Sequence, residues 1–195
     1  SFTFDTGFAG KIKIPNNLEY YKKKILQDKF ILSNGINSIG LYGTSKTNKT
    51  IELKNEIYID NLLFKDELID TGESTLIGNK FLKNYIFLID WKSNKIYLKS
   101  IINSDKKQVK SFGFSYLFDK GKPIVISKIE NKKIPINLGD EIIRIDDFDF
   151  TTIKSEDFCK YYLNKVVKDK EVIDITVKRE NKLLNFKLEK QTFIK

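Results

Sequence analysis

The first residues of the chain place one carboxylate at the end of a predicted strand. In the run Phe2-Thr3-Phe4-Asp5-Thr6-Gly7, apolar and polar residues alternate up to Asp5, and this alternation is typical of a strand whose two faces differ. Gly7 follows, where the backbone can turn or approach another chain closely. A carboxylate presented in this way is suited to acid–base work, although Asp-Thr-Gly at a strand end is also an ordinary turn.

The composition limits which other chemistry the chain can perform. It has no histidine, which excludes Ser-His-Asp and Cys-His catalysis and any histidine metal site within it. The one cysteine, Cys159, follows Phe158 in a helical pattern, so we expect a core thiol and no internal disulfide. Ser–Lys catalysis is a further option, but no Ser-x-x-Lys lies in a clear site context. Acid–base work is left to Asp, Glu, Lys or Tyr, and we predict no metal and no cofactor.

The net charge of +9 raises the question of nucleic-acid binding. Arg144 and Arg179 are the only arginines, although arginine is the residue best suited to bidentate contacts with phosphates and bases. The lysines are scattered, and the densest run, Lys22-Lys23-Lys24, is short. We therefore interpret the lysines as solvated surface and expect no nucleic-acid partner. No stretch approaches the roughly 20 apolar residues of a membrane span, so we expect no such span.

Alternating apolar residues and turn signals predict a mainly β chain in two parts. With 195 residues, 41% of them apolar, the chain can bury one large core or two small ones. The polar run at 100–110 marks the predicted boundary. In the first part we expect strands at 11–14, 51–53, 57–59, 62–64 and 95–99, a buried strand at 85–91, and a hairpin at 38–45 with its tip at or near Thr47-Asn48. We also expect a helix at 17–28 and a short helix at 79–84 with Phe81 and Leu82 turned inward. In the second part we expect a strand at 123–129, a tight turn at 138–141 that leads into a strand, a helix at 155–166 and a hairpin over 172–188.

Three motifs give residues 1–99 a resemblance to the retropepsin-like aspartic peptidases. Phe4-Asp5-Thr6-Gly7 resembles the signature loop of that family. Leu41-Tyr42-Gly43-Thr44 is similar to the tyrosine-bearing flap of pepsin-like enzymes. Leu76-Ile77-Gly78-Asn79 resembles the apolar pair plus glycine that packs under the catalytic loop and starts a helix. Gly78 follows Asp5 by 73 residues, about the length of one half-barrel, and the run on to Trp91 resembles bacterial members.

This resemblance implies a half-pepsin β-barrel that hydrolyses peptides with two carboxylates facing each other across a water. Such a close pair shares one proton, because two like charges at that distance cannot both ionise. One half-barrel supplies one acid, so Asp5 would meet Asp5 of a second chain across a two-fold axis. Thr6 would bond across the dimer, Gly7 would leave room for the substrate, and Tyr42 and Gly43 would close over the peptide. The resemblance also suggests an extracytoplasmic protein, with a peptidase domain at 1–101 that lacks its first strands.

Residues 108–192 resemble a PDZ domain, a β-barrel with one helix beside its peptide groove. Phe112-Gly113-Phe114 is similar to the carboxylate-binding loop of that family, and the run 138–145 is similar to its Leu-Gly-Asp-x-Ile strand entry. The predicted helix at 155–166 would form a wall of the groove. A PDZ domain after an aspartic peptidase domain is a known bacterial arrangement. The resemblance therefore implies an endopeptidase that also recognises peptide ends or a neighbouring domain.

Two departures from the family pattern leave alternatives open. The family usually has Ala or Ser after Asp-Thr-Gly, whereas this chain has Phe8. The peptidase half could therefore be degenerate, and the protein would then be a non-catalytic module that binds peptides in the PDZ groove. Asp70-Thr71-Gly72 is a second Asp-Thr-Gly, but it follows Asp5 by only 65 residues, too few for a whole pepsin lobe. We interpret Asp70 as part of a turn.

Overall fold

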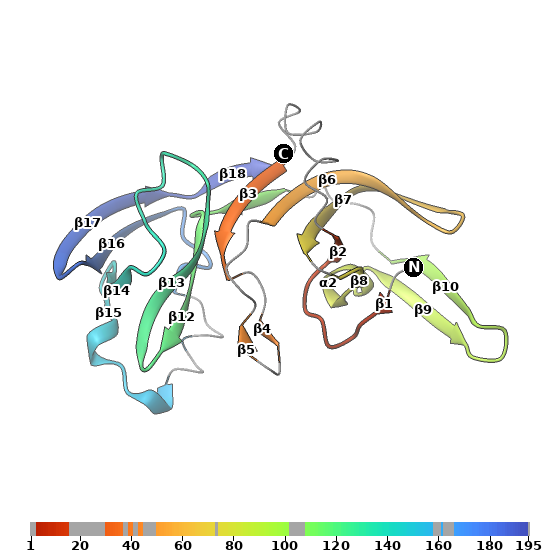
Figure 1. Ribbon diagram of the computed structural model, residues 1–195, viewed down its shortest axis with the longest axis horizontal. Coiled ribbons are helices and arrows are strands. Elements are labelled where there is room, and N and C mark those ends of the chain that lie inside the picture. The colour runs from red at the N-terminus through yellow and green to blue at the C-terminus, as the bar shows by residue number, and fades with distance from the viewer. Residues whose placement is uncertain are drawn as a thin grey trace. The chain divides into compact units, whose positions relative to one another are not determined.

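The chain folds into two compact units made almost entirely of β-strands (Figure 1). The computed structural model describes residues 3–15, 30–36, 39–40, 43–44, 50–72, 74–101, 108–157, 161 and 166–194. The first unit takes in Ser1–Ile31, Thr50–Val109 and Ile194–Lys195, and the second takes in Leu32–Lys49 and Lys110–Phe193. The predicted mainly β class is confirmed. Among the described residues, no helix is long and apolar enough to cross a membrane.

The main division between the units falls at Val109 and Lys110, at the end of the polar run that predicts a boundary. One segment is grouped differently from the prediction, because residues 32–49 belong to the second unit and not to the first. The pairing of β3 (Phe30–Gly35) explains this grouping. Its residues 33–35 pair antiparallel with residues 127–129 of β13 (Lys122–Ile129), which lies in the second unit.

The first unit is built on a five-stranded sheet and one short helix. Its elements are β1 (Thr3–Phe4), β2 (Ile12–Pro15), β6 (Thr50–Ile59), β7 (Leu62–Gly72), β8 (Leu76–Ile77), α2 (Asn79–Leu82), β9 (Tyr85–Asp90) and β10 (Lys95–Ser100). The sheet order is β1-β8-β2-β7-β6, while β9 and β10 form a separate two-stranded sheet. β8 is parallel to β1 and antiparallel to β2, and β2 is parallel to β7. β8 therefore lies between two consecutive strands of the sequence, β1 and β2, and its pairing with β1 fixes the position of that strand.

Isoleucines at matching positions form the centre of this sheet. Ile12 stands opposite both Ile69 of β7 and Ile77 of β8, and all three side chains are buried. Residues opposite each other on neighbouring strands share a face of the sheet, so these three pack as one layer. The pairing holds β2 and β8 in a single register, because a shift by one residue would turn the isoleucines to the other face.

The short helix α2 completes this core, as its apolar residues predict. Phe81 and Leu82 are both buried, which confirms the predicted inward face of the helix. The Phe81 ring lies 5.2 Å from the ring of Phe64 and 4.8 Å from that of Tyr85, measured between centroids. Burial raises the pKa of Tyr85, with the nearby charge of Glu67 as a smaller cause. The contacts of Phe81 therefore fix α2 against both β7 and the start of β9.

The second Asp-Thr-Gly is not a turn, so that prediction is wrong. Asp70, Thr71 and Gly72 form the end of β7 and pair with Lys13, Ile14 and Pro15 of β2. Thr71 is buried within this strand pair. The parallel pairing with β2 extends β7 through a motif whose composition favours a turn, because ladder hydrogen bonds outweigh local preference.

The predicted strand at 85–91 exists as β9, but the prediction that it is buried is wrong. Its side chains at 86–89 are exposed, and Ile86 and Leu88 each keep 59% of their surface accessible. Trp91, in the turn that follows, is 80% exposed. A continuous apolar run usually marks a strand covered on both faces. Here only the base of β9, at Tyr85, packs against the core of the unit.

The predicted hairpin near residues 38–45 is present in part. β4 (Ile39–Gly40) and β5 (Gly43–Thr44) pair antiparallel, with Gly40 opposite Gly43. The tip predicted at Thr47-Asn48, the helix predicted at 17–28 and Cys159 lie outside the described residues.

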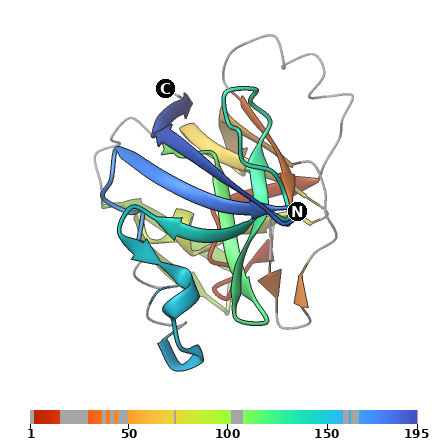
Figure 2. The ribbon, with the colours of Figure 1, turned by 90° about the vertical axis from the view of Figure 1, so that its left-hand side faces the viewer.

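The second unit consists of a sheet, the separate β4–β5 hairpin and a few helical turns (Figure 2). Its further elements are β11 (Val109–Ser111), β12 (Phe114–Asp119), β14 (Glu141–Ile145), β15 (Phe148–Asp149), β16 (Val172–Arg179), β17 (Lys182–Glu189), β18 (Gln191–Ile194) and 3₁₀ helices at Phe150–Thr152 and Ser155–Asp157. The strand order is β3-β13-β14-β16-β17, with β12 on β13 and β15 on β14, and β11 pairs with β18. In neither unit do the described strands close into a complete barrel.

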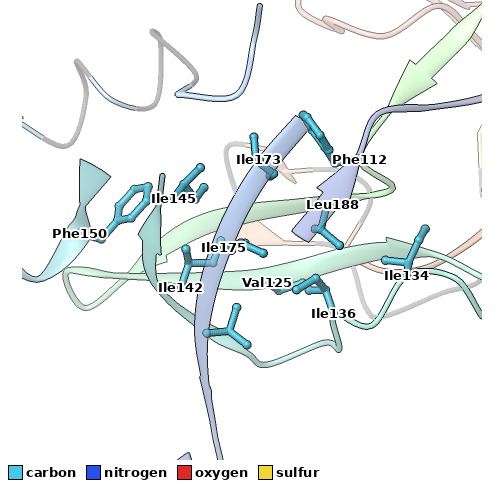
Figure 3. Close-up of a cluster of buried hydrophobic side chains, with 11 residues drawn as sticks. Phe112, Val125, Ile134, Ile136, Ile142, Ile145, Phe150, Ile173, Ile175 and Leu188 are labelled. Carbon is cyan, nitrogen blue, oxygen red and sulfur yellow. The ribbon is translucent and has the colours of Figure 1, made fainter. Parts of the chain in front are cut away.

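Buried apolar side chains from seven segments of the second unit form its core (Figure 3). They alternate along β16, where Ile173, Ile175 and Val177 point inward while the residues between them are more exposed. The complete cluster is Phe112, Val125, Ile134, Ile136, Ile142, Ile145, Phe150, Ile173, Ile175, Val177 and Leu188. In Figure 2 the blue β16–β17 hairpin crosses in front of the green β12–β13 hairpin, and the cluster draws on both.

A buried ion pair locks the tight turn at 138–141, which the structure confirms. The Arg179 guanidinium donates to both carboxylate oxygens of Asp140, over 2.8 Å from Nε and 2.7 Å from Nη2. Arg179 also donates to the carbonyl of Pro135, and the backbone N–H of Asn137 donates to Asp140 Oδ2. Asp140 is 1% exposed, and its hydrogen bonds raise the pKa of Arg179 above the ordinary value. The pair therefore ties β16 to the turn before β14.

Candidate active site

Asp5 lies directly after β1, at the point where that strand ends beside β8. Thr3 and Phe4 stand opposite Leu76 and Ile77 in the parallel pair. The backbone N–H of Asp5 donates to the carbonyl of Ile77 over 3.0 Å. The Asp5 side chain is half-buried. The strand pairing thus places the carboxylate at a fixed position next to the end of β8.

The residues after Asp5 fold back onto its carboxylate. Asp5 Oδ1 accepts hydrogen bonds from the backbone N–H of Gly7 at 2.9 Å and of Phe8 at 3.2 Å. The N–H of Phe8 also donates to the Asp5 carbonyl. No hydrogen bond from another described residue reaches Oδ2. One carboxylate oxygen is therefore oriented by the loop.

Hydrogen bonds from the start of α2 hold the loop that follows Asp5. The backbone N–H of Asn79 donates to the carbonyl of Phe8 over 2.8 Å, and the N–H of Lys80 donates to that of Gly10 over 2.9 Å. The side-chain amide of Asn79 donates to the carbonyl of Thr6. These bonds satisfy the free N–H groups at the beginning of the helix with carbonyls of the loop. This is the arrangement predicted for Leu76-Ile77-Gly78-Asn79, which lies under the Asp5 loop and starts a helix.

Gly78 has no side chain because the loop passes too close to it. A Cβ there would lie 2.5 Å from the carbonyl oxygen of Phe8 and 2.6 Å from that of Gly10. Backbone atoms cannot swing aside as a flexible side chain can. The backbone N–H of Gly78 also donates to the carbonyl of Lys11 over 2.7 Å. Glycine at this position therefore allows the loop that carries Asp5 to pack directly against the start of α2.

Replacing Gly78 by Ala is expected to destabilise the first unit by about 1–3 kcal/mol, because the added methyl forces the loop backbone to move. The free energy of unfolding in urea is the measurement. Lys80→Ala on the same helical turn is the matched control, since Lys80 is exposed and its loop contact is made by the backbone. An unchanged stability in Gly78→Ala would contradict the close packing of the loop on α2.

The Phe8 side chain is accommodated within the loop that follows Asp5. Its ring lies beside the α-carbons of Gly10 and Gly78, where side chains would collide with it. The ammonium of Lys13 lies 4.9 Å from the ring centroid, which is within the range of a cation–π contact. The ring is half-buried. The two glycines thus make room for the unusual residue, so Phe8 alone is a weak argument for a degenerate site.

Asp70 is too far from Asp5 along the sheet to serve as its partner. In the order β1-β8-β2-β7, three strand spacings separate the strand before Asp5 from the strand that holds Asp70. At about 4.8 Å per spacing this is about 14 Å. A shared proton needs carboxylates in hydrogen-bond contact. The two Asp-Thr-Gly motifs of one chain therefore do not form an acid pair.

The structure brings together only some of the predicted site residues. Asp5, Thr6 and Gly7 form one loop with Gly78 and Asn79. Tyr42 lies outside the described residues, and Gly43 lies at the start of β5, which is grouped with the second unit. Sequence reasoning missed the amide of Asn79 as a support for Thr6, although its place after a helix-starting glycine was a signal for it.

The predicted carboxylate-binding loop shows a backbone that only glycine adopts easily. Gly113 has φ +81°, and a side chain there would collide with Ile134. Its N–H donates to Ser111 Oγ, and its carbonyl accepts from the N–H of Ile129. Phe112 is buried in the core, and Phe114 is half-buried against it. The aromatic side chains therefore support the loop, and both backbone groups of Gly113 have partners within the unit.

β12 offers an edge beside this loop. It pairs with β13 on one side, and no other described strand pairs with it. An open strand edge can accept a peptide as an added strand. Within the helix predicted at 155–166, the structure describes a 3₁₀ helix over 155–157 and the helical Tyr161, whose ring lies 4.6 Å from that of Phe148 between centroids.

Comparison with protein-family models, curated proteins and solved structures finds no match for this chain. Among the described residues, no group of three or more histidine, cysteine, aspartate or glutamate side chains could hold a metal ion. The two candidate sites are Asp5 with its loop in the first unit and the Gly113 loop with the β12 edge in the second.

Proposed function

We propose that the protein is an aspartic endopeptidase that works as a homodimer. The observation that carries this proposal is the loop that holds one oxygen of Asp5 by two backbone N–H groups and rests on Gly78 and α2. Such a loop keeps the carboxylate in one orientation without using a charged partner. Asp5 then acts as base toward a water in one chain and as acid toward the peptide carbonyl in the other.

The second copy is part of the proposed mechanism because Asp70, in the other Asp-Thr-Gly of the chain, does not supply the second acid. Asp70 lies about 14 Å away by strand count, and the chain contains no histidine to act in its place. Two Asp5 carboxylates that meet across a two-fold axis share one proton and so divide the roles of acid and base. Thr6 and Gly7, which adjoin Asp5 in the loop, would lie at the same axis.

A cleavage assay tests the proposed activity. The full chain is incubated with an unfolded protein substrate between acid and neutral pH, with and without pepstatin. The expected result is pepstatin-sensitive cleavage that is strongest at acid pH, where the carboxylate pair holds its single proton. Cleavage that pepstatin leaves unchanged would assign the activity to another mechanism.

A second function rests on the Gly113 loop and the open edge of β12. We propose that the second unit binds a peptide C-terminus, as PDZ domains do, with the peptide added as a strand to β12. This function does not require the peptidase to be active. It is therefore the alternative if the Asp5 loop proves inert.

Binding of a C-terminal peptide is expected to depend on its free carboxylate. Amidation of the peptide terminus should weaken binding by roughly 10- to 100-fold, because a charge-assisted hydrogen bond contributes about 1.5–3 kcal/mol. Fluorescence polarisation with a labelled peptide library selects the ligand, and the amidated form of the best peptide is the control. Equal affinity of the two forms would show that the Gly113 loop does not recognise a carboxylate.

A further inference from the structure

The hairpin of β9 and β10 carries apolar side chains that are exposed to solvent. Ile86 stands opposite Lys99, Leu88 opposite Tyr97 and Asp90 opposite Lys95. Because opposite residues and alternate residues share a face, these six side chains form one face, which we call the outer face. The opposite face contains Tyr85, whose ring packs against those of Phe64 and Phe81.

The outer face has an apolar centre, with Lys99 at one end and Asp90 opposite Lys95 at the other. Ile86, Leu88 and Tyr97 are 59%, 59% and 53% exposed. The run from 79 to 100 contains one acid, Asp90, and five lysines: Lys80, Lys83, Lys92, Lys95 and Lys99. All five lysines are exposed.

The single acid of the hairpin is occupied by the turn. Asp90 Oδ1 accepts from the backbone N–H groups of Lys92 and Ser93, and Oδ2 accepts from Ser93 Oγ at 2.6 Å. These hydrogen bonds, that of the Ser93 hydroxyl first, lower the pKa of Asp90. The Asp90 carboxylate therefore faces the hydrogen-bond donors of the turn. The chain's only tryptophan, Trp91, lies in the same turn and is 80% exposed.

We propose that the outer face docks on the surface of an anionic phospholipid bilayer. Tyr and Trp favour the headgroup level of a bilayer, and lysine stems can lie along apolar surface while their ammonium groups reach lipid phosphates. Each lysine near an anionic surface adds to the attraction. The outer face therefore combines the apolar, aromatic and cationic groups that bind to such a surface.

Charge and area argue against a second copy as the occupant. Two hairpins packed face to face would bring lysines of like charge together, on chains that each carry a net charge of +9. Three large apolar side chains also fall well short of the roughly 800 Å² per partner that a stable protein interface buries. A lipid surface needs no such area and is attracted by the same lysines.

The hairpin docks flat and not tip first. Its turn presents Lys92, Ser93 and Asn94, all polar, beside Trp91, so the turn as a whole cannot enter the hydrocarbon. The free edges of a two-stranded sheet also carry backbone groups that need water or another partner. Docking is therefore shallow, with Ile86, Leu88 and Tyr97 at the boundary of headgroups and acyl chains.

Vesicle binding by the full chain tests the proposal, and Trp91 is a built-in reporter. Vesicles of phosphatidylcholine alone are compared with vesicles that also contain phosphatidylserine. We expect co-sedimentation and a blue shift of Trp91 emission with the anionic vesicles only, and both should weaken as salt is added. Absence of binding, or equal binding to both kinds of vesicle, would overturn the proposal.

Two variants locate the binding on the outer face. Leu88→Ser is expected to weaken binding by roughly tenfold or more, since the burial of a leucine side chain is lost. Lys95→Gln with Lys99→Gln should weaken it by roughly tenfold or more, since two attractive charges are lost. Leu183→Ser on β17 is the matched control, because Leu183 is an equally exposed leucine (62%) on a hairpin of the other unit, and it should bind as the parent does.

Two outcomes with these variants would also overturn the proposal. One is unchanged vesicle binding by Leu88→Ser. The other is a dimer, measured by sedimentation equilibrium without lipid, that Leu88→Ser dissolves and Leu183→Ser does not, since the outer face would then be covered by a second copy. Asp5→Asn should bind vesicles normally, so the result is independent of the proposed peptidase activity.

Discussion

Replacing Asp5 by Asn is expected to lower kcat/KM for peptide cleavage by roughly 10³- to 10⁴-fold, because each copy in the dimer loses its acid–base group. The substitution keeps the shape of the side chain, and the Asn Oδ1 can still accept from the N–H groups of Gly7 and Phe8. The loop should therefore stay folded. Cleavage of a fluorogenic peptide at acid pH, with circular dichroism to verify folding, is the measurement.

Asp70→Asn is the matched control for this experiment. It makes the same change in the second Asp-Thr-Gly, which lies in β7 and pairs with β2. Its kcat/KM should equal that of the parent chain. If Asp5→Asn retained full activity, or if only Asp70→Asn lost it, the assignment of the acid to the N-terminal loop would be wrong.

The second large effect is expected from Asp140→Ala, which should lower the free energy of unfolding of the second unit by about 3 kcal/mol. Removal of one partner from a buried ion pair typically costs about 3–5 kcal/mol. The lower end applies because the Arg179 side chain keeps 28% of its surface exposed and can regain some water. The N–H of Asn137 also loses its acceptor. Urea unfolding followed by circular dichroism measures the change.

Asp174→Ala in the same unit is the control, because Asp174 is exposed on β16 and a surface substitution should stay within about 0.5 kcal/mol. Hydrogen exchange should show that the protection lost in Asp140→Ala lies in β14 and β16, the strands on either side of the pair. Equal effects of the two variants would mean that the Asp140–Arg179 pair contributes no more than a surface charge.

Much of the fold could be predicted where local pattern and tertiary contacts agree. The alternation of apolar residues correctly gave the strands on either side of Asp60, which has φ 52° in the turn between β6 and β7. Phe81 and Leu82 are buried as predicted, since α2 follows directly from a strand and has one apolar face. The turn at Gly139, with φ +85°, is another local feature that glycine marks clearly.

The errors lie where a long-range contact decides the outcome. Asp70-Thr71-Gly72 has the composition of a turn, but β2 pairs along it and extends β7. No local signal reports that pairing. The apolar run at 85–91 predicts burial, yet burial depends on what lies on each side of a strand, and the sequence of β9 carries no information about that. The placement of residues 32–49 with the second unit depends likewise on the pairing of β3 with β13.

The candidate site was predictable only in its local part. Asp5 with its two following residues and the glycine of Ile77-Gly78 can be found by residue type and spacing, because each has a local role. That Phe8 fits between Gly10 and Gly78 could not be predicted, since it depends on two glycines that are far apart in the sequence but close in space.

A mixing experiment tests the central claim most directly. Parent chain and Asp5→Asn chain are combined in varying ratio at constant total concentration, allowed to exchange, and assayed for peptide cleavage. If two Asp5 side chains form one site, activity should fall as the square of the parent fraction, so an equal mixture keeps about one quarter of the activity. A linear fall to one half would contradict the account, because each chain would then cleave with its own Asp5 alone.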